Sequence, residues 1–242
     1  MIASAMSVVE LLDRPTYGIT QVDRLLSLRP GTAKRWIDGY VRAGVAYQPV
    51  IRPETTGNEA VTWGEFVETR LLSEFRDKGI PMINLRPAVS RLRDELGVRY
   101  PLAYAKPYLD VDGRELVRAI QNELDLDAGL WLVTVRSNQL VLTTPADHFR
   151  RSVEFAPTAD GGSDVAARIH PFPDDGRVVM DPLRRFGQPV VRAVPTDVIA
   201  EQFRAGDPIE MISDLYELPS EEIQAAIRYE MARGGSTVQP AA

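Results

Sequence analysis

The amino-acid sequence predicts a mainly α-helical fold with a small antiparallel β part. Apolar residues recur at helical spacing in segments that begin with a capping residue and end at glycine, such as the segment 63–78, which follows Thr62 and stops at Gly79. Short β-rich runs gather in the middle of the chain, where turns rich in Gly, Pro and Asp at 160–163 and 171–176 separate them. We therefore expect helices at both ends of the chain and strands between them.

The composition of the 242 residues narrows the possible classes of protein. Cysteine is absent, which excludes disulfides and thiolate metal sites and fits a reducing cytoplasm. No apolar run reaches the ~20 residues that span a bilayer, and the N-terminus lacks a charged-then-apolar signal pattern. We expect a cytoplasmic protein that does not associate with membranes.

Charge is distributed unevenly along the chain, whose net charge is −6. Residues 1–53 carry seven Lys/Arg and four Asp/Glu, whereas residues 111–242 carry thirteen Lys/Arg and twenty-one Asp/Glu. A basic N-terminal segment followed by an acidic remainder predicts that the N-terminal segment binds nucleic acid and that the remainder binds a different kind of ligand.

The stretch from Thr20 to Tyr40 has the pattern of a helix-turn-helix. Thr20 and Asp23 suit the start of a first helix, and Pro30 suits the first position of a second. The facing apolar sides would be Val22, Leu25 and Leu26 in the first helix and Ala33, Trp36, Ile37 and Tyr40 in the second. The candidate DNA contacts on the opposite face are Arg29, Thr32, Lys34 and Arg35. Taken alone, the segment could equally be a helical hairpin with a solvated basic face.

The residues after this stretch predict a wing. A strand is expected at 46–52, a turn at 54–59 around Gly57 and Asn58, and a return strand that includes Val61. Arg52 would then lie along a phosphate backbone. A wing beside the two helices is more specific than the helices alone, and it favours a winged helix-turn-helix.

Two longer helices follow the predicted wing. Thr62 and Glu65 form a capping box ahead of a helix over 63–78, and a further helix closes at Gly97, with Pro87 either beginning or kinking it. The segments ITQVDRLLSLRPGTAKRWIDGY, WGEFVETRLLSEFRDKGIP and YPLAYAKPYLDVDG resemble the DNA-binding half of MerR-type regulators. The resemblance covers residues 17–113.

The middle of the chain predicts short strands. After a helix at 114–122, a hairpin is expected from 130–135 and 139–143 around Ser137 and Asn138. Further strands are expected at 152–155, 165–169 and 178–180. We interpret these runs as one small antiparallel sheet, acting as a connector or a dimerisation surface.

The last part of the chain predicts three capped helices, starting at Thr196, at Asp207 and Pro208, and at Ser220, with Ile223 and Ile227 turned inward. The residues expected on their surface are mostly acidic: Glu210, Asp214, Glu217, Glu221, Glu222 and Glu230. Because such a surface repels phosphates, its expected ligand is a protein.

This part also resembles the small C-terminal domain, long labelled as being of unknown function, of VapB-type antitoxins. The resemblance covers residues 177–232 and rests on three short segments and a helix pair: Asp181-Pro182, Phe186-Gly187-Gln188-Pro189-Val190-Val191, Ala205-Gly206, and the pair with Tyr216 and Ala226-Ile227. Many members carry a glycine-containing segment after the paired valines, where this chain has Arg192-Ala193-Val194-Pro195.

The resemblance implies a toxin partner of the PIN ribonuclease class. The candidate toxin-binding residues are Arg184, Arg185, Phe186, Arg192 and Tyr216. An arginine could pair with the clustered carboxylates of such a nuclease, or a groove between the acidic helices could take up a toxin helix. Docking in the groove is favoured narrowly, because the acidic helices offer more surface than the few arginines.

Motifs for catalysis are missing from the sequence. The two histidines, His148 and His170, have no metal-ligand spacing, and the chain contains no GxSxG motif, no Walker loop and no cysteine. We expect no enzymatic activity, no cofactor and no metal site. The two remaining hypotheses are an antitoxin that also binds its operator, and a MerR-like one-component regulator that responds to a small molecule.

These patterns together predict a division of the chain and a homodimer, because one helix-turn-helix reads only half of a two-fold operator. The expected parts are a winged helix-turn-helix at 1–62, a helical extension at 63–113, a β-rich connector and possible dimerisation surface at 114–176, a three-helix antitoxin-type module at 177–233 and a flexible tail at 234–242.

Overall fold

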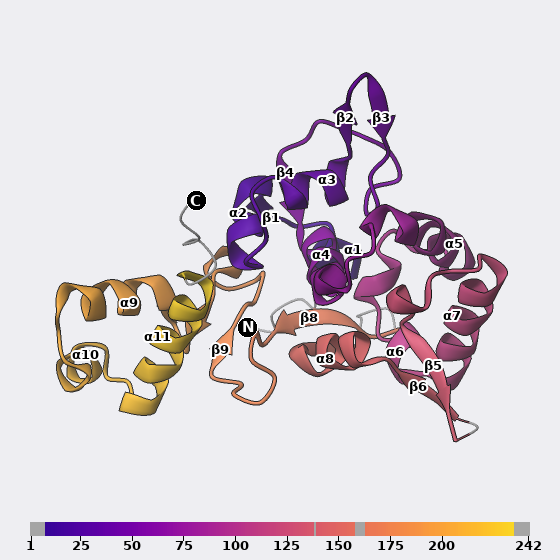
Figure 1. The fold of residues 1–242 in the computed structure, drawn as a ribbon. Helices are drawn as coiled ribbons and strands as arrows, with labels where there is room; N and C mark the ends of the chain where they lie inside the picture. The colour runs from indigo at the N-terminus through magenta and orange to yellow at the C-terminus, as the bar shows by residue number, and fades with distance from the viewer. Residues whose placement is uncertain (1–7, 138, 158–162, 235–242) are drawn as a thin grey trace. The chain divides into compact units, whose positions relative to one another are not determined.

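The computed structural model describes residues 8–137, 139–157 and 163–234 (Figure 1). The chain divides into two compact units, residues 1–167 (unit 1) and residues 168–242 (unit 2). Helices predominate in both units, and the strands form small antiparallel pairings, as the sequence predicts. The predicted cap Ser7 and the predicted tail, apart from Gly234, lie outside the described residues.

Unit 1 alternates short helices with strand pairs. Its helices are α1 (Val8–Leu12), α2 (Ile19–Leu25), α3 (Thr32–Asp38), α4 (Trp63–Phe75), α5 (Arg86–Leu96), α6 (Lys106–Leu109), α7 (Val111–Glu123) and α8 (Thr144–Ser152). Its strands are β1 (Pro15–Gly18), β2 (Tyr40–Arg42), β3 (Val45–Tyr47), β4 (Ala60–Thr62), β5 (Val133–Arg136), β6 (Gln139–Leu142), β7 (Val153–Ala156) and most of β8 (Val165–Ile169).

Helix α4 forms the centre of the core of unit 1. The predicted capping box is confirmed, because the Thr62 hydroxyl accepts from the backbone N–H of Glu65 while the Glu65 carboxylate accepts from the backbone N–H of Thr62. The helix passes into a 3-10 turn that ends at Gly79, which has a φ of 71°. It is buried on nearly all sides, where it packs against α1, α3, α8 and the β1–β4 pair. The two sequence signals at 62 and 79 therefore define the most buried helix of the unit.

One ionisable side chain lies inside this core. Glu68 on α4 is fully buried, and its Oε1 accepts from the backbone N–H of Leu102 at 3.0 Å. Its Oε2 has no hydrogen-bond partner among the described residues. Burial raises the pKa of Glu68 to about 8, because a charged carboxylate is poorly solvated there.

Helices α2 and α3 pack against each other ahead of α4. Val22, Ala33 and Ile37 are buried as the sequence predicts. Trp36 is only half-buried, and Tyr40 is exposed because the chain leaves the helix at Gly39 and enters β2. The prediction that Tyr40 packs on the first helix is therefore wrong.

The expected wing is also wrong in its position. The hairpin forms earlier, from β2 and β3, with Tyr40 opposite Tyr47 and a turn at Ala43 and Gly44, both of which have positive φ. In Figure 1 this hairpin projects from unit 1 beyond α3. Strand β4, which was expected to return against residues 46–52, pairs instead with β1.

The second half of unit 1 is more helical than its sequence predicts. The helix ending at Gly97, begun by Pro87, and the β5–β6 hairpin are confirmed. Helix α8 was not predicted; it packs on α4, and its Ala146 and Phe149 are fully buried. The predicted single sheet is wrong, because β5–β6 and β7–β8 are separate two-stranded pairs.

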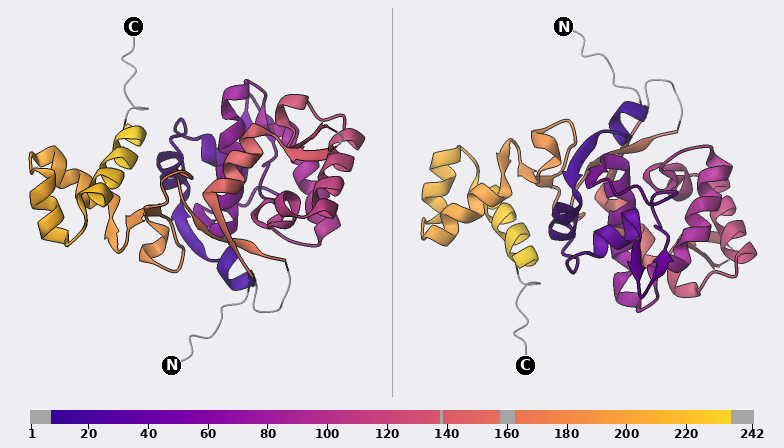
Figure 2. Two further views of the ribbon diagram at one scale, coloured as in Figure 1. Left: turned by 90° about the horizontal axis from the view of Figure 1, so that it is seen from below. Right: turned by 90° about the horizontal axis from the view of Figure 1, so that it is seen from above.

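Unit 2 joins a small sheet to three helices. The sheet has the order β11 (Val194–Pro195), β10 (Val190–Val191), β9 (Val178–Val179), and the helices are α9 (Thr196–Ala205), α10 (Ile209–Tyr216) and α11 (Ser220–Gly234). These helices begin where the sequence predicts. Their buried faces, with Ile223 and Ile227 turned inward, pack with the sheet into one apolar cluster. Figure 2 shows the three helices, orange to yellow, gathered together in both views.

Candidate functional site

A buried carboxylate fixes the start of α3. Asp23 of α2 is buried, and its two oxygens accept from the backbone N–H groups of Gly31 and Ala33, each at 2.7 Å. These donors lie at the start of α3, where a helix leaves N–H groups without intrahelical partners. The sequence assigned Asp23 to the first turn of its own helix, so its role as a cap for the next helix is a correction.

Three of the predicted DNA contacts lie on α3 and one lies just before it. Arg29, Lys34 and Arg35 are exposed, and Thr32 is half-buried, where its hydroxyl accepts from Arg35 Nη2 at 3.0 Å. Lys34 Nζ forms an exposed ion pair with Glu59 Oε1 at 2.9 Å, and this hydrogen bond raises the pKa of Lys34. The side chain of Arg29 forms no ion pair or hydrogen bond with the described residues.

Arg52, the fifth predicted DNA contact, is only 6% exposed and cannot lie along a phosphate backbone. Its Nε bonds Glu65 Oε1 at 2.8 Å, and its Nη1 bonds Asp38 Oδ1 at 2.9 Å. Its remaining donors reach the carbonyls of Asn58 and Ala60, each at 2.8 Å. This is a correction: Arg52 ties α3, α4 and the loop before β4 together.

Hydrogen bonds also determine the charge state of Asp38 in this network. Burial alone would raise its pKa, but donors from Thr56, Arg52 and Gly57 outweigh burial and hold the pKa of Asp38 below its usual value. The buried guanidinium of Arg52 therefore faces a carboxylate that stays charged at neutral pH. The end of α3 is held by ionic contacts in the protein interior.

The β2–β3 hairpin places aromatic and basic side chains beside α3. The rings of Tyr40 and Tyr47 are stacked, with centroids 4.6 Å apart and planes within 4°. Arg42 near the tip is exposed and forms no ion pair with the described residues, and Val41 is 72% exposed. The sequence signal for this hairpin was weak, since its turn uses Ala43 in place of the usual Asn or Asp.

In unit 2, three of the predicted toxin contacts gather in one turn. Arg185, Phe186 and Gly187 all have positive φ, at 48°, 53° and 73°. Phe186 is 78% exposed, and Arg184 and Arg185 are exposed beside it. Non-glycine residues in this region cost free energy, of order 1–3 kcal/mol each, and such strain is typical of binding sites. The strained backbone of this turn therefore holds the ring of Phe186 in solvent.

A buried carboxylate supports this turn. Asp181 is 4% exposed, and its Oδ1 accepts from the backbone N–H of Leu183 at 2.8 Å. Its Oδ2 accepts from Arg168 Nε at 2.9 Å. Arg184 lies 3.7 Å from the same oxygen, whereas Arg185 has no ion pair with the described residues. Asp181 therefore anchors the start of the turn, whereas Arg185 and Phe186 are free to contact a partner.

The other two predicted toxin contacts lie elsewhere in unit 2. Arg192 also has a positive φ, of 52°, and it pairs with Glu222 at 2.9 Å. Tyr216 is half-buried against the apolar cluster of unit 2. The structure therefore brings Arg184, Arg185 and Phe186 together but not Arg192 and Tyr216.

The acidic surface predicted for the helices of unit 2 needs one correction. Glu230 is buried and accepts a 2.6 Å hydrogen bond from the Thr196 hydroxyl, while Glu222 is half-buried. The remaining predicted acids are exposed: Glu210, Asp214, Glu217 and Glu221. They share the surface with exposed apolar side chains of α9 and α10: Phe203, Met211 and Leu215.

Within residues 8–137, 139–157 and 163–234, His, Cys, Asp and Glu side chains form no group of three or more that could hold a metal ion. No helix there is both long and apolar enough to cross a membrane.

The apolar cluster and the strained turn of unit 2 belong to a recognisable domain class. Residues 178–229 match the family "Protein of unknown function (DUF433)". The whole chain has a relative in Mycobacterium tuberculosis, the uncharacterized protein Rv2308, at 37% identity over 93% of each chain. At that identity and coverage, this protein belongs to the same family as Rv2308.

Two other matches from Mycobacterium tuberculosis, one of sequence and one of structure, cover most of the chain. One, named "Putative antitoxin VapB45", is 29% identical over 89% of this chain and 93% of its own length. The other is Rv2018, whose crystal structure matches with a TM-score of 0.70 and 27% identity over 89% of this chain and 99% of its own. The similarity thus extends through both units and is not confined to residues 178–229.

Proposed function

We propose that this protein is an antitoxin that neutralises a PIN-type ribonuclease by direct binding and binds its own operator DNA to repress the shared operon. Similarity to VapB45 along both units supports the antitoxin class. The single observation that carries the toxin-binding half is the strained turn that exposes Phe186.

Phe186 has the properties of an interface anchor. An aromatic ring that is 78% exposed gains most free energy when a partner removes it from water, and aromatic residues dominate interface hot spots. Arg184 and Arg185 flank the ring, and guanidinium groups pair with the carboxylates that line a PIN-type active site. We therefore place the ring in an apolar pocket of the toxin, with the arginines at the edge of its acidic cavity.

The helices of unit 2 offer a second contact surface. Phe203, Met211 and Leu215 are exposed beside the acids of α10. A toxin helix could cover these apolar side chains while the acidic residues steer a basic partner surface. This is the groove mechanism favoured from the sequence, and it acts together with the Phe186 turn.

For DNA, we assign base and phosphate contacts to Arg29, Thr32, Lys34 and Arg35. They lie on or beside α3, whose start is fixed by Asp23. The β2–β3 hairpin takes the role expected of the later wing, and its exposed Arg42 takes the phosphate contact expected of Arg52. Since one such unit reads a half-site, the operator-bound form is a homodimer.

The test is to express the full chain with the ribonuclease encoded beside it. The proposal expects restored growth of the host, copurification of the two proteins, and inhibition of RNA cleavage by the purified nuclease. A chain that copurifies with nothing and leaves cleavage unchanged when in excess would overturn the toxin-binding half. Gel shifts with the upstream DNA test the operator half separately.

A further inference from the structure

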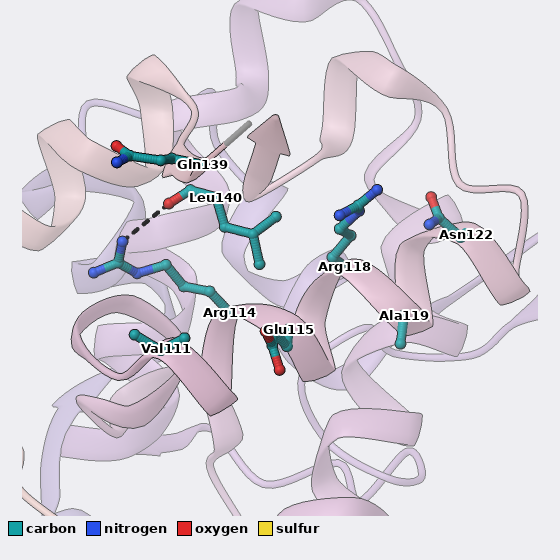
Figure 3. Close-up of a pocket in the computed structure, with 8 residues that line it drawn as sticks. All are labelled: Val111, Arg114, Glu115, Arg118, Ala119, Asn122, Gln139 and Leu140. Carbon is teal, nitrogen blue, oxygen red and sulfur yellow. Dashed lines mark hydrogen bonds between the residues drawn. The ribbon is translucent and has the colours of Figure 1, made fainter. Parts of the chain in front are cut away.

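Unit 1 contains a cleft that neither the DNA face nor the Phe186 turn explains. It has a volume of about 720 Å³ and lies between α7 and β6 (Figure 3). This volume falls within the range of small-molecule sites, about 300–1,000 Å³. Its wall combines apolar side chains, such as Val111 and Leu140, with two arginines, one glutamate and two amides: Arg114, Arg118, Glu115, Asn122 and Gln139.

Arg114 is fixed in the cleft wall without a counter-charge. Its Nε donates to the carbonyl of Tyr108 at 3.1 Å, its Nη1 to that of Leu140 at 3.1 Å, and its Nη2 to that of Leu109 at 3.3 Å. All three acceptors are neutral, and no carboxylate of the described residues pairs with Arg114. The guanidinium is therefore held in position with its positive charge uncompensated.

Arg118 follows one helical turn later and adds a second uncompensated charge. Its side chain is exposed and makes no hydrogen bond or ion pair with any residue that the structure describes. Glu115 lies between the two arginines in sequence, but in Figure 3 it turns away from both, and it forms no ion pair with them. Like charges at this spacing on a helix repel each other. An anion bound in the cleft would offset this repulsion between Arg114 and Arg118.

We propose that this cleft binds a small anionic molecule through a phosphate or carboxylate group. Arg118 would contact the anion directly, since planar guanidinium groups bind both kinds of oxyanion through paired hydrogen bonds. Figure 3 shows Arg114 and Arg118 extending on either side of Leu140, which offers an apolar surface to the body of the ligand. The amides of Asn122 and Gln139 supply neutral hydrogen-bonding groups. The site is separate from the proposed toxin and operator contacts.

The acids on the same helix argue for a small ligand over a nucleic acid. Helix α7 also exposes Asp112, Glu115 and Glu123, which would repel a continuous phosphate backbone. A compact anion can reach Arg118 without passing along those carboxylates. The cleft thus suits a small molecule whose anionic groups lie close together.

The experiment is calorimetric titration of the full-length protein with pyrophosphate and with citrate, at ionic strength held constant with sodium chloride. We expect binding of at least one probe, weakened tenfold or more by Arg118→Gln. The matched control is Arg204→Gln, which removes an exposed arginine without an ion-pair partner in the described part of unit 2. Melting temperatures check that both variants remain folded.

The outcomes separate the possible sources of the anion. Binding of pyrophosphate alone assigns a phosphate ligand, binding of citrate alone assigns a carboxylate ligand, and each supports the site. Binding of neither probe at millimolar concentration would overturn the proposal, as would equal affinity in the wild type and Arg118→Gln. Toxin inhibition and operator binding are unaffected by Arg118→Gln if the sites are separate, so failure here leaves the proposed function standing.

Discussion

Both units expose aromatic side chains to solvent, but the backbone that carries these side chains is stabilised in unit 1 and strained in unit 2. In unit 1, Tyr40 and Tyr47 stack across a regular hairpin next to a helix held by the buried Arg52 network. In unit 2, Phe186 stands in a run of positive φ angles with its ring 78% exposed. Buried ionic contacts stabilise the surroundings of the tyrosine pair, whereas the exposed position of Phe186 costs free energy as backbone strain.

This difference predicts opposite effects of mutation in the two units. Removing a member of the buried network leaves charges without partners, so the free energy of unfolding should fall. Replacing Phe186 by glycine should raise it, because the ring is 78% exposed and glycine adopts a positive φ without strain. Function should be lost in both cases, but for different reasons.

The largest expected effect is that of Arg52→Ala. The change leaves the Asp38 and Glu65 carboxylates buried without their guanidinium, which costs about 3–5 kcal/mol in buried ionic networks. Chemical denaturation should show this loss in the free energy of unfolding. Arg35→Ala, an exposed arginine of the same unit, is the control and should stay near the wild type. An Arg52→Ala protein as stable as the wild type would show that the network is not structural.

The buried carboxyl of Glu68 should make stability depend on pH. Its pKa is raised from 4.5 to about 8 in the folded protein, so its protonated form favours folding. This contribution is complete below about pH 4.5 and is lost as the pH rises to 8, at up to roughly 1.4 kcal/mol per pH unit. Glu68→Gln should remove this dependence.

The measurement is denaturant unfolding of the wild type and Glu68→Gln between pH 5 and pH 8. The difference between their free energies of unfolding should widen in favour of the variant as the pH rises. Glu123→Gln, at an exposed position, should follow the wild type. Parallel pH profiles for the wild type and Glu68→Gln would contradict the assignment.

In unit 2, Phe186→Gly should separate stability from binding. Glycine adopts a φ of 53° without strain, so the free energy of unfolding should rise by up to ~1 kcal/mol. Toxin affinity should fall by about 2–4 kcal/mol, as for an aromatic hot spot. Denaturation and calorimetric titration with the ribonuclease measure the two effects.

Asp125→Gly is the matched control for the backbone. Asp125 has a φ of 46° just after α7 in unit 1, it is exposed, and it belongs to none of the proposed toxin contacts. It should gain similar stability and keep its affinity for the toxin. If Phe186→Gly also keeps full affinity, the toxin site lies outside the turn.

Local signals in the sequence predicted the parts of the fold that local chemistry determines. The Thr62–Glu65 capping box, the Ser220 start of α11 and the inward face with Ile223 and Ile227 all follow from residues within one or two helical turns. The β5–β6 hairpin was likewise predicted from the residues of its own strands and turn. The C-terminal helices were predicted for the same reason.

The errors have a different physical origin. Arg52 was expected in solvent because its partners Asp38 and Glu65 lie 14 and 13 residues away, beyond any local pattern. Asp23 caps a helix that begins nine residues later for the same reason. The turn has Ala43 before Gly44, where Asn or Asp is usual for positive φ, so the hairpin was placed too late. Charged residues are thus the hardest to assign, because the same side chain suits a surface or a buried pair.

A smaller effect is expected when Arg29 and Arg35 are replaced by alanine. Each lost base contact should weaken operator binding by about 1–3 kcal/mol, while the free energy of unfolding changes by no more than about 0.5 kcal/mol. Fluorescence anisotropy with the upstream DNA measures the affinity, and Arg204→Ala in unit 2 controls for net charge. Unchanged operator affinity in the double variant would remove α3 from the DNA interface.

The smallest expected effect concerns the ion pair between Lys34 and Glu59 beside α3. The pair is exposed, with its atoms 2.9 Å apart, and Lys34 must leave Glu59 before it can meet a phosphate. Glu59→Gln should therefore strengthen operator binding by a few-fold at most, as is usual for an exposed pair. The gain should disappear at high salt, because salt screens exposed charges. Glu54→Gln makes the same charge change in the same loop without an ion pair among the described residues. The measurement is the operator affinity of the wild type, Glu59→Gln and Glu54→Gln at low and high salt. If the two variants bind the operator equally well, the change in net charge and not the release of Lys34 explains any gain.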